Sequence, residues 1–360
     1  MVWLLLLSGL VLLIFGADML VKGAAKLAGS FGVPPLVIGL TVVAFGTSAP
    51  ELAVSVKSAW SGQAELAIAN VIGSNIFNIL FILGLAALIS PLLVSKQLIR
   101  QDVPIMIAVS AIATVMVWNG LLERWESAIL FLALLAYTGF LFIQGKKQND
   151  EEGIAEIDEL LSGNTPTWKS VLYFVVGLIL LVLGARWLVQ SAISIATGLG
   201  VSEAVIGLTI VAMGTSLPEV MTSVMATIRG ERDIAIGNVV GSNIFNILCV
   251  LGLAGLISPE PLIAGPQLAT LDIPVMLAVS VLCLPLFFVG GTLTRFEGFL
   301  FLLLYTSYVS YMILLVTQSN FATTLVQALI YGLISAVFVY VCFTVGNDLV
   351  RRNRQSHHEL

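Results

Sequence analysis

Apolar runs long enough to cross a lipid bilayer recur along nearly the whole chain, and they limit its fold more than any other feature. Each run holds roughly 17 to 25 residues, which at about 1.5 Å per residue crosses a hydrocarbon core about 30 Å thick. A transmembrane β-barrel would instead show short segments of alternating polarity. With 58% hydrophobic and 10% charged residues, the chain has too little polar surface to cover a water-soluble globule. We therefore expect an all-α polytopic membrane protein.

Glycine, proline and clusters of charge divide the apolar sequence into eleven spans. The predicted spans are 2–21, 33–59, 65–90, 103–119, 125–144, 169–190, 201–227, 234–257, 271–290, 297–317 and 323–346.

A constant shift in numbering, which places Glu219 on Glu51, aligns the second half of the chain with the first. The segment GTSAPELAVSV aligns with GTSLPEVMTSV, and VIGSNIFNIL aligns with VVGSNIFNIL. Each copy contains five predicted spans, and an odd number brings the chain into the second copy from the opposite side of the membrane. We therefore predict two inverted five-helix repeats with broken helices at the membrane midplane, plus an extra carboxyl-terminal transmembrane helix.

One long polar connection separates the two copies. Residues 148–164 hold six acidic residues and no basic one, so this connection accounts for the net charge of −5. The spacing of its acids lacks the alternating oxygens and glycine of a calcium-binding EF-hand loop, which favours a solvated linker. The predicted units are a first repeat (1–144), an acidic linker (145–168), a second, inverted repeat (169–318), and an extra span with a basic tail (319–360).

The basic residues predict the orientation in the membrane. With the amino terminus outside, only Lys57, Arg124 and Arg186 of the 16 basic residues lie at the outer face, and the other 13 lie inside. Basic residues concentrate on the cytoplasmic side of membrane proteins. We therefore expect an integral membrane protein of the plasma or bacterial inner membrane, with the amino terminus outside and the carboxyl terminus in the cytoplasm.

Two glutamates at equivalent repeat positions lie in the middle of apolar spans. An ionised side chain at that depth costs at least about 2.5 to 3.5 kcal/mol, and no basic residue lies near Glu51 or Glu219 along the sequence. Pro50 and Pro218 precede them and cannot donate the helical hydrogen bond, so each helix is expected to break there. Broken backbone at membrane depth is tolerated where it lines a cavity. Each repeat therefore offers a half-site of oxygen atoms, with the hydroxyls of Thr47, Ser48, Thr215 and Ser216 beside the carboxylates.

The next span of each repeat carries the motif GSNIFN. Its serine and final asparagine are four residues apart and share a helix face. Such residues can line a site or hold helices together, and their duplication beside the glutamates favours the site. The residues in question are Ser74, Asn78, Ser242 and Asn246.

All of these candidate ligands are oxygen atoms, and no histidine or cysteine is among them. Oxygen ligands favour Ca²⁺ or Na⁺ over zinc or copper, and Mn²⁺ stays compatible. Two carboxylates match one divalent cation, and an emptied site would leave them uncompensated. The sequence therefore favours exchange of one cation for another over transport in one direction.

These duplicated motifs resemble the α-repeats of the calcium/cation antiporter superfamily, in particular a prokaryotic-type member of the sodium/calcium exchanger family. The resemblance covers roughly residues 1–318. It implies a ten-helix exchanger in which spans 2, 3, 7 and 8 form the site, Na⁺ and Ca²⁺ compete, and spans 1 and 6 slide across the rest. Asn246 stands where potassium-dependent relatives have aspartate, which resembles a potassium-independent member. The implied ligands are Glu51, Glu219, Thr47, Ser48, Thr215, Ser216, Ser74, Asn78, Ser242 and Asn246, with backbone carbonyls that include those of Ala44 and Ala212.

The leading hypothesis is therefore a secondary antiporter that exchanges Ca²⁺ for Na⁺, and the alternative is a proton-coupled antiporter of Ca²⁺ or another divalent cation. An intramembrane hydrolase is disfavoured because no span contains a histidine base and no lysine lies near Ser48 or Ser216, so we do not expect an enzyme. A channel fits broken inverted repeats less well than alternating access does, and a purely structural scaffold would not need duplicated buried glutamates. We expect no resident cofactor and no nucleic-acid partner. Membrane lipid and the transported ions are the expected partners, and the oligomeric state and the role of the eleventh span stay open.

Overall fold

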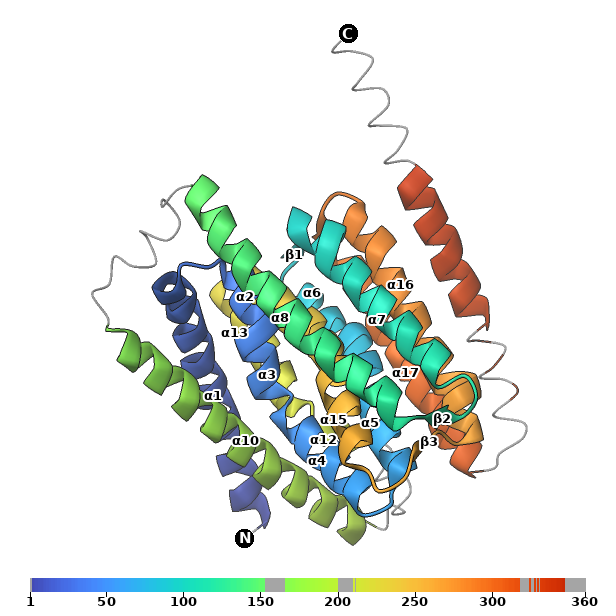
Figure 1. Cartoon of the computed structure of the whole chain (residues 1–360). Coiled ribbons are helices and arrows are strands. Elements are labelled where there is room, and N and C mark those ends of the chain that lie inside the picture. Colours follow the sequence, from blue (N-terminus) through green and yellow to red (C-terminus); the bar gives the residue numbers. More distant parts are fainter. Residues whose placement is uncertain are drawn as a thin grey trace.

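The computed structural model describes residues 2–152, 166–199, 210, 212–317, 324, 327, 329 and 331–346, and it shows a bundle of tilted helices (Figure 1). Within this part of the chain, eight helices are long and apolar enough to cross a membrane, and one bent pair makes a ninth. The polytopic all-helical prediction is confirmed.

The first half of the chain begins with a long helix and continues with helices that are interrupted by π-helical turns. Its elements are α1 (Val2–Phe31), α2 (Pro35–Ile38), η1 (Gly39–Val43), α3 (Ala44–Thr47), α4 (Ala49–Trp60), α5 (Ala64–Phe77), η2 (Asn78–Leu83), α6 (Gly84–Ile89), β1 (Leu92–Leu93), η3 (Leu98–Asp102), α7 (Val103–Met116), β2 (Leu121–Leu122) and α8 (Arg124–Glu152).

The second half repeats this order over the residues that the structure describes. Its elements are α10 (Thr167–Gly198), α12 (Ala212–Gly214), α13 (Leu217–Arg229), α14 (Arg232–Phe245), η5 (Asn246–Leu251), α15 (Gly252–Ile257), β3 (Leu262–Ile263), η6 (Leu268–Asp272), α16 (Ile273–Phe288), β4 (Thr292–Leu293) and α17 (Arg295–Thr317), followed by a shorter apolar helix, Tyr331–Gly346.

Several predicted spans differ from these helices at their ends. Helix α1 continues about three turns beyond the predicted end of the first span, and α8 continues to Glu152, into the predicted linker. The predicted span 201–227 is described only in its second part, as α12 and α13, and the predicted eleventh span only from 331 to 346 apart from three single residues. The tail from 347 onward lies outside the described residues.

Helices α1 and α10 are repeat equivalents that pack backbone to backbone and run antiparallel, as two inverted repeats require of this pair (Figure 1). Gly9 lies against Gly184, and Gly16 lies against Gly177, so the numbering rises along one helix and falls along the other. A Cβ atom on Gly16 would lie 2.8 Å from the carbonyl oxygen of Gly177. Only glycine permits this close an approach, a packing mode common between membrane helices.

This helix pair sits unevenly on the rest of the bundle. Helix α1 packs along α13, and Asp18 on α1 forms ion pairs with Lys22 and with Arg229 at the end of α13. The equivalent contact between α10 and α4 is nearly absent among the described residues. The pair is therefore displaced toward one of the two repeats.

Two pairs of very short antiparallel strands join the repeats at the ends of the bundle. Strand β1 pairs with β4, and β2 pairs with β3, so each pair takes one strand from each half of the chain. These links tie the loops of one repeat to those of the other and fix how the two halves meet.

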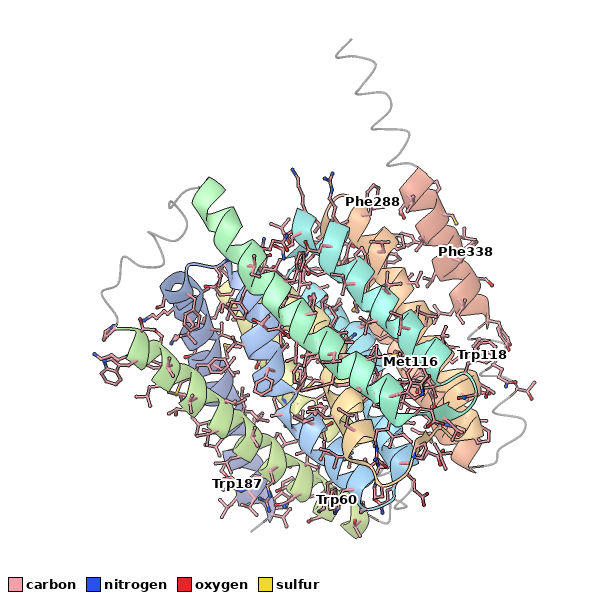
Figure 2. All side chains as sticks on the ribbon, viewed as in Figure 1. Trp60, Met116, Trp118, Trp187, Phe288 and Phe338 are labelled. Atoms are coloured by element: carbon pink, nitrogen blue, oxygen red, sulfur yellow. The ribbon has the colours of Figure 1, made fainter. Side chains whose placement is uncertain are left out.

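The outer surface is apolar, as expected for helices in contact with lipid. Trp60 ends α4, and Trp118 follows α7; they expose 68% and 82% of their surface (Figure 2). Trp125 and Trp168 lie at the starts of α8 and α10 and are also exposed. Tryptophan concentrates where a membrane meets water, so these side chains are consistent with helix ends at the bilayer surface.

Candidate functional site

Both predicted helix breaks fall within the GTS motifs: at Ser48 in the first repeat, and at Thr215 and Ser216 in the second, where α12 ends at Gly214 and α13 begins at Leu217. Helix α3 ends at Thr47 and α4 begins at Ala49, with a bend of 47° between the two segments. Ser48 has a φ of −81° and a ψ of 7°, and Ser216 has a φ of −88° and a ψ of 8°, so both lie outside the helical range. Pro50 and Pro218 therefore occupy the first turn of a new helix, where a missing N–H leaves no bond unmade.

Glu51 and Glu219 follow directly in the first turns of α4 and α13. Their side chains are buried, with 0% and 1% of their surface exposed. The amino terminus of a helix stabilises a nearby negative charge, because the unpaired backbone N–H groups of its first turn carry partial positive charge. Neither glutamate forms an ion pair with any described residue. The helix breaks therefore place two carboxylates inside the bundle without a basic partner from this part of the chain.

The hydrogen bonds to these carboxylates cross between the repeats. Ser216 donates to Oε1 of Glu51 at 2.7 Å, and Ser48 donates to Oε1 of Glu219 at 2.9 Å. Ser216 also lies 3.1 Å from the hydroxyl of Ser74. Each carboxylate is thus held by the serine that precedes the other one, which brings the two half-sites together.

Asn78 and Asn246 begin the π-helical turns η2 and η5, and both are fully buried. A π-helical turn widens the helix by one residue and is common at functional sites. The two turns occur at equivalent positions of the two repeats, directly after the GSNIF segments. The predicted asparagines therefore lie where each helix departs from regular geometry.

The side chains of Thr47 and Thr215 contact residues that the sequence analysis did not single out. Thr47 donates to the amide oxygen of Asn238 at 3.1 Å, and Thr215 donates to that of Asn70 at 3.5 Å. Asn70 in turn donates to the backbone oxygen of Glu51, and Asn238 to that of Glu219, at 3.2 and 3.5 Å. These asparagines thus tie each threonine to the helix that carries the glutamate of the opposite repeat.

Ser55 and Ser223 extend the hydrogen bonds around these asparagines. They accept from Asn70 at 2.9 Å and from Asn238 at 3.0 Å, respectively. Both pairs were detectable in the sequence, because the shift that places Glu219 on Glu51 also aligns Asn70 with Asn238 and Ser55 with Ser223. Identical polar residues at equivalent places in two membrane repeats are the signal that would have found them.

Ala44 lies buried in α3, and its carbonyl oxygen accepts a bond from the N–H of Ser48 at 3.0 Å. The hydroxyl of Thr47 lies 3.4 Å from the same oxygen, but its single hydrogen is donated to Asn238, the nearer acceptor. This predicted carbonyl ligand therefore keeps one lone pair. Ala212 begins α12, the equivalent helix of the second repeat.

Several buried oxygen atoms at the centre have no hydrogen-bond partner among the described residues. This is unusual, because buried polar atoms are nearly always paired. The unpaired atoms carry lone pairs and are suited to a cation, and together with the paired hydroxyls they form what we call the central site. The unpaired atoms of this site are Oε2 of Glu51, Oε2 of Glu219, Oδ1 of Asn78, Oδ1 of Asn246 and Oγ of Ser242.

The central site therefore combines carboxylate, amide and hydroxyl oxygens, and its described part contains no cluster of three or more His, Cys, Asp or Glu residues. Oxygen ligands suit hard cations such as Ca²⁺ and Na⁺. Ionisable residues buried within membrane helices typically mark an ion pathway. The fold and the site together define a membrane transporter of a hard cation.

Comparison with known proteins agrees with this class. The family described as "Sodium/calcium exchanger protein" matches residues 1–143 and 169–314. The inner membrane protein YrbG of Escherichia coli (strain K12) is 41% identical, over 77% of this chain and 86% of its own length. The sodium/calcium exchanger MaX1 of Methanosarcina acetivorans is 34% identical, over 85% of this chain and 97% of its own.

A solved structure of the sodium-calcium exchanger NCX_Mj, soaked with Na⁺ and Sr²⁺, is similar along most of its length. It superimposes with a TM-score of 0.74 at 34% identity, over 85% of this chain and 96% of the other. The chain belongs to the sodium/calcium exchanger family. It is thus a cation antiporter of an integral membrane family, not an enzyme, as the sequence predicted.

Proposed function

We propose that this chain exchanges Na⁺ for Ca²⁺ across the membrane by alternating access to the central site. The observation that carries the proposal is the crossed pair of bonds, in which Ser216 holds Glu51 and Ser48 holds Glu219. One oxygen of each carboxylate is fixed in this way, and the other has no partner among the described residues. Carboxylate oxygens without another partner are ligands that a divalent cation such as Ca²⁺ takes.

The proposed ligands are side chains that the two repeats supply in equivalent pairs. The neutral amides of Asn78 and Asn246 add oxygen without adding charge, so the glutamates alone give the site a charge of −2. One Ca²⁺ balances this charge, and Na⁺ ions compete for the same oxygens. The ions are cargo, and we propose no resident cofactor. The proposed set is Glu51, Glu219, Thr47, Ser48, Thr215, Ser216, Ser74, Asn78, Ser242 and Asn246, with the carbonyls of Ala44 and Ala212.

Charge balance favours exchange over one-way transport. If the site returned empty with both glutamates ionised, Glu51 and Glu219 would be buried charges with only hydroxyl donors. Unpaired buried charge is strongly unfavourable, and removing one partner of a buried ion pair costs about 3 to 5 kcal/mol. A second cation that accompanies the return removes this cost. The site is therefore suited to the exchange of one cation for another.

We propose that α1 and α10 move together across the rest of the bundle to open the site to each side in turn. Their backbone contact supports movement as one unit, and their uneven packing supports a structure displaced toward one side. The distribution of basic residues supports a protein of the plasma or bacterial inner membrane with its amino terminus outside. We assign no chemistry to the helix Tyr331–Gly346.

The test is uptake of ⁴⁵Ca²⁺ into proteoliposomes that hold an outward Na⁺ gradient at clamped pH. We expect Na⁺-driven uptake in the parent and its loss in Glu51→Gln and Glu219→Gln. The matched control is Glu65→Gln, because Glu65 is exposed at the start of α5 and lies outside the central site. Loss of uptake in the control as well would contradict the assignment of the two glutamates.

The second candidate is a proton-coupled antiporter of Ca²⁺ or another divalent cation. The unpaired Oε2 atoms of Glu51 and Glu219 favour it, because each can take up a proton in place of a metal ion. In the same liposomes, a pH gradient would then drive uptake without Na⁺. Uptake that follows the proton gradient and ignores Na⁺ would overturn Na⁺ coupling and leave the site in place.

A further inference from the structure

Asn75 and Asn243 occupy equivalent positions inside the GSNIFN motifs and have no role in the site described above. They expose 1% and 0% of their surface, so both amides must find partners within the protein. Their side chains reach across the junction between the repeats. Asn75 donates through Nδ2 to the backbone oxygen of Asn243 at 3.2 Å, and Asn243 donates to that of Asn75 at 3.3 Å.

These reciprocal bonds fix which way each amide points. A backbone carbonyl oxygen only accepts, so the NH₂ group of Asn75 must face it and the amide oxygen must face away. A sulfur atom lies beside each NH₂ group as a second weak acceptor: Met276 at 3.7 Å from Asn75, and Met106 at 3.7 Å from Asn243. Reversing either amide would set its oxygen against a carbonyl and a sulfur.

The fixed amide oxygens then orient the proposed ligands. Oδ1 of Asn75 accepts from Nδ2 of Asn246 at 3.0 Å, and Oδ1 of Asn243 accepts from Nδ2 of Asn78 at 3.0 Å. Because the NH₂ groups of Asn246 and Asn78 are used in this way, their oxygens point in the opposite direction. Those two oxygens are among the unpaired atoms of the central site.

We propose that Asn75 and Asn243 are positioning residues that make Asn246 and Asn78 present oxygen, rather than NH₂, to the transported cation. The proposal rests on the proposed function of the central site. The positioning crosses between the repeats: Asn75 of the first repeat orients Asn246 of the second, and Asn243 of the second orients Asn78 of the first. Without this constraint, each ligand amide rotates freely and turns two N–H donors toward a positive ion in part of the molecules.

An aspartate at position 246 or 78 would not need to be oriented, because both of its outer atoms are oxygens. In the parent, however, one of those oxygens would lie against Oδ1 of Asn75 or Asn243, with no hydrogen between them. The asparagine pairs 75–246 and 243–78 are therefore matched to each other. This difference between amide and carboxylate gives a test that separates orientation from packing.

The test combines two positioning variants with two ligand variants. Asn75→Leu and Asn243→Leu keep the branched shape of the side chain, with a somewhat larger volume, and remove the amide. Removing a partner that orients a metal ligand typically lowers affinity about 10- to 100-fold, and we expect a loss of roughly this size in ⁴⁵Ca²⁺ binding to each single variant. Adding Asn246→Asp to Asn75→Leu should recover most of the affinity, whereas adding Asn78→Asp should not. Asn243→Leu should show the reverse preference.

Each of the four double variants carries one Asn→Leu and one Asn→Asp substitution at equivalent buried positions, so we expect a similar loss of stability in all four. A difference in affinity among them therefore does not come from a general loss of stability. Asn75→Ala and Asn243→Ala repeat the comparison with smaller side chains if the leucine variants do not yield monodisperse protein. Equal recovery by both aspartates would show a general charge effect and overturn the proposal, as would recovery by neither. Equal gains from Asn246→Asp in the parent and in the Asn75→Leu background would also overturn it.

The outcome for the proposed function is separate. If the parent binds no Ca²⁺, calcium exchange is contradicted, and the same comparison is made with ²²Na⁺ or Mn²⁺ binding. The crossed recovery pattern then tests the orientation of the two amides for that cation. A parent that binds Ca²⁺ without the crossed pattern would retain the exchanger and exclude the positioning role.

Discussion

The contact between α1 and α10 gives a prediction that can be worked from geometry. A Cβ atom on Gly177 would lie 2.5 Å from the backbone nitrogen of Leu20, 2.7 Å from the oxygen of Gly16 and 2.9 Å from the Cα of Leu20. All three neighbours are backbone atoms and have no side-chain rotation by which to move aside. Ordinary contact begins at 3.4 Å, so the closest contact is too short by 0.9 Å, the difference between 3.4 and 2.5 Å. Gly177→Ala must therefore push the two helices apart.

Overpacking of this kind costs about 1 to 3 kcal/mol, and the three backbone clashes favour the upper end. Alanine in a helix recovers up to about 1 kcal/mol relative to glycine. We expect a net loss of about 2 kcal/mol, which corresponds to a melting temperature lower by on the order of 5 °C. The measurement is thermal unfolding of detergent-solubilised protein, followed by intrinsic tryptophan fluorescence.

The matched control is Gly139→Ala on α8, where a Cβ atom would meet nothing within 4 Å. This variant gains helix propensity without a clash, so its melting temperature should equal or exceed that of the parent. If Gly177→Ala and Gly139→Ala melt at the same temperature, the two helices do not lie backbone to backbone, and the reasoning is refuted.

Three further predictions concern the site and the ion pair of α1. Ser216→Ala removes the hydroxyl that donates to Glu51 at 2.7 Å. A hydrogen bond to a charged group contributes about 1.5 to 3 kcal/mol, so the KM for Ca²⁺ should rise about tenfold or more. An unchanged KM would contradict the crossed bond. Ca²⁺ at about 100 times its Kd should stabilise the parent by about 2.7 kcal/mol in a thermal unfolding assay, and Glu51→Gln should lose this stabilisation; equal stabilisation of both would place Ca²⁺ elsewhere. Arg229→Gln breaks the ion pair between α13 and Asp18 of α1. This ion pair is partly exposed and contributes up to about 1 kcal/mol to the contact between the two helices. Its loss should let the helices separate more often, so maleimide labelling of a cysteine placed between α1 and α13 should rise a few-fold. Arg186→Gln, at a basic residue with no ion pair in the described part of the chain, is the control and should leave the labelling unchanged.

Much of the central site was predictable because each repeat of the chain supplies one copy of the same half-site. One constant shift along the sequence pairs Glu51 with Glu219, and a buried carboxylate without a basic neighbour implies a cation. Proline after the GTS motif predicted the broken helix, and the structure bends at Ser48. These conclusions depend on local chemistry and on the repeat, both of which are visible in the sequence.

The crossing of the hydrogen bonds was not predictable from the same information. Ser48 is three residues from Glu51, and sequence distance suggests that they belong to one half-site. In the structure Ser48 instead holds Glu219, because the helix breaks of the two repeats face each other. The roles of Asn75 and Asn243 depend on the same geometry, since the hydrogen bonds of each amide, including the weak one to a methionine sulfur, all go to the other repeat.

The predicted span ends differed for a physical reason. Hydropathy reports where a segment leaves the apolar layer, whereas a helix ends where its backbone hydrogen bonds end. Lys22 and Lys26 mark the end of the apolar stretch in α1, but nothing there interrupts the helix, which continues to Phe31 before Gly32 adopts a positive φ of 61°. Helix α8 continues through charged residues to Glu152 for the same reason.

The crossed bonds also constrain when the first repeat can complete its fold during synthesis. Glu51 accepts its hydrogen bond from a serine 165 residues later in the chain, so the first repeat leaves the ribosome before that donor exists. Until α13 inserts, the carboxylate has no partner from the second repeat and can be solvated only if α4 stays near water or packs loosely. The amino-terminal half is therefore expected to mature in the bilayer only when the second half arrives. A truncated chain that ends in the linker would therefore leave this carboxylate unpaired, and quality-control proteases are expected to degrade it.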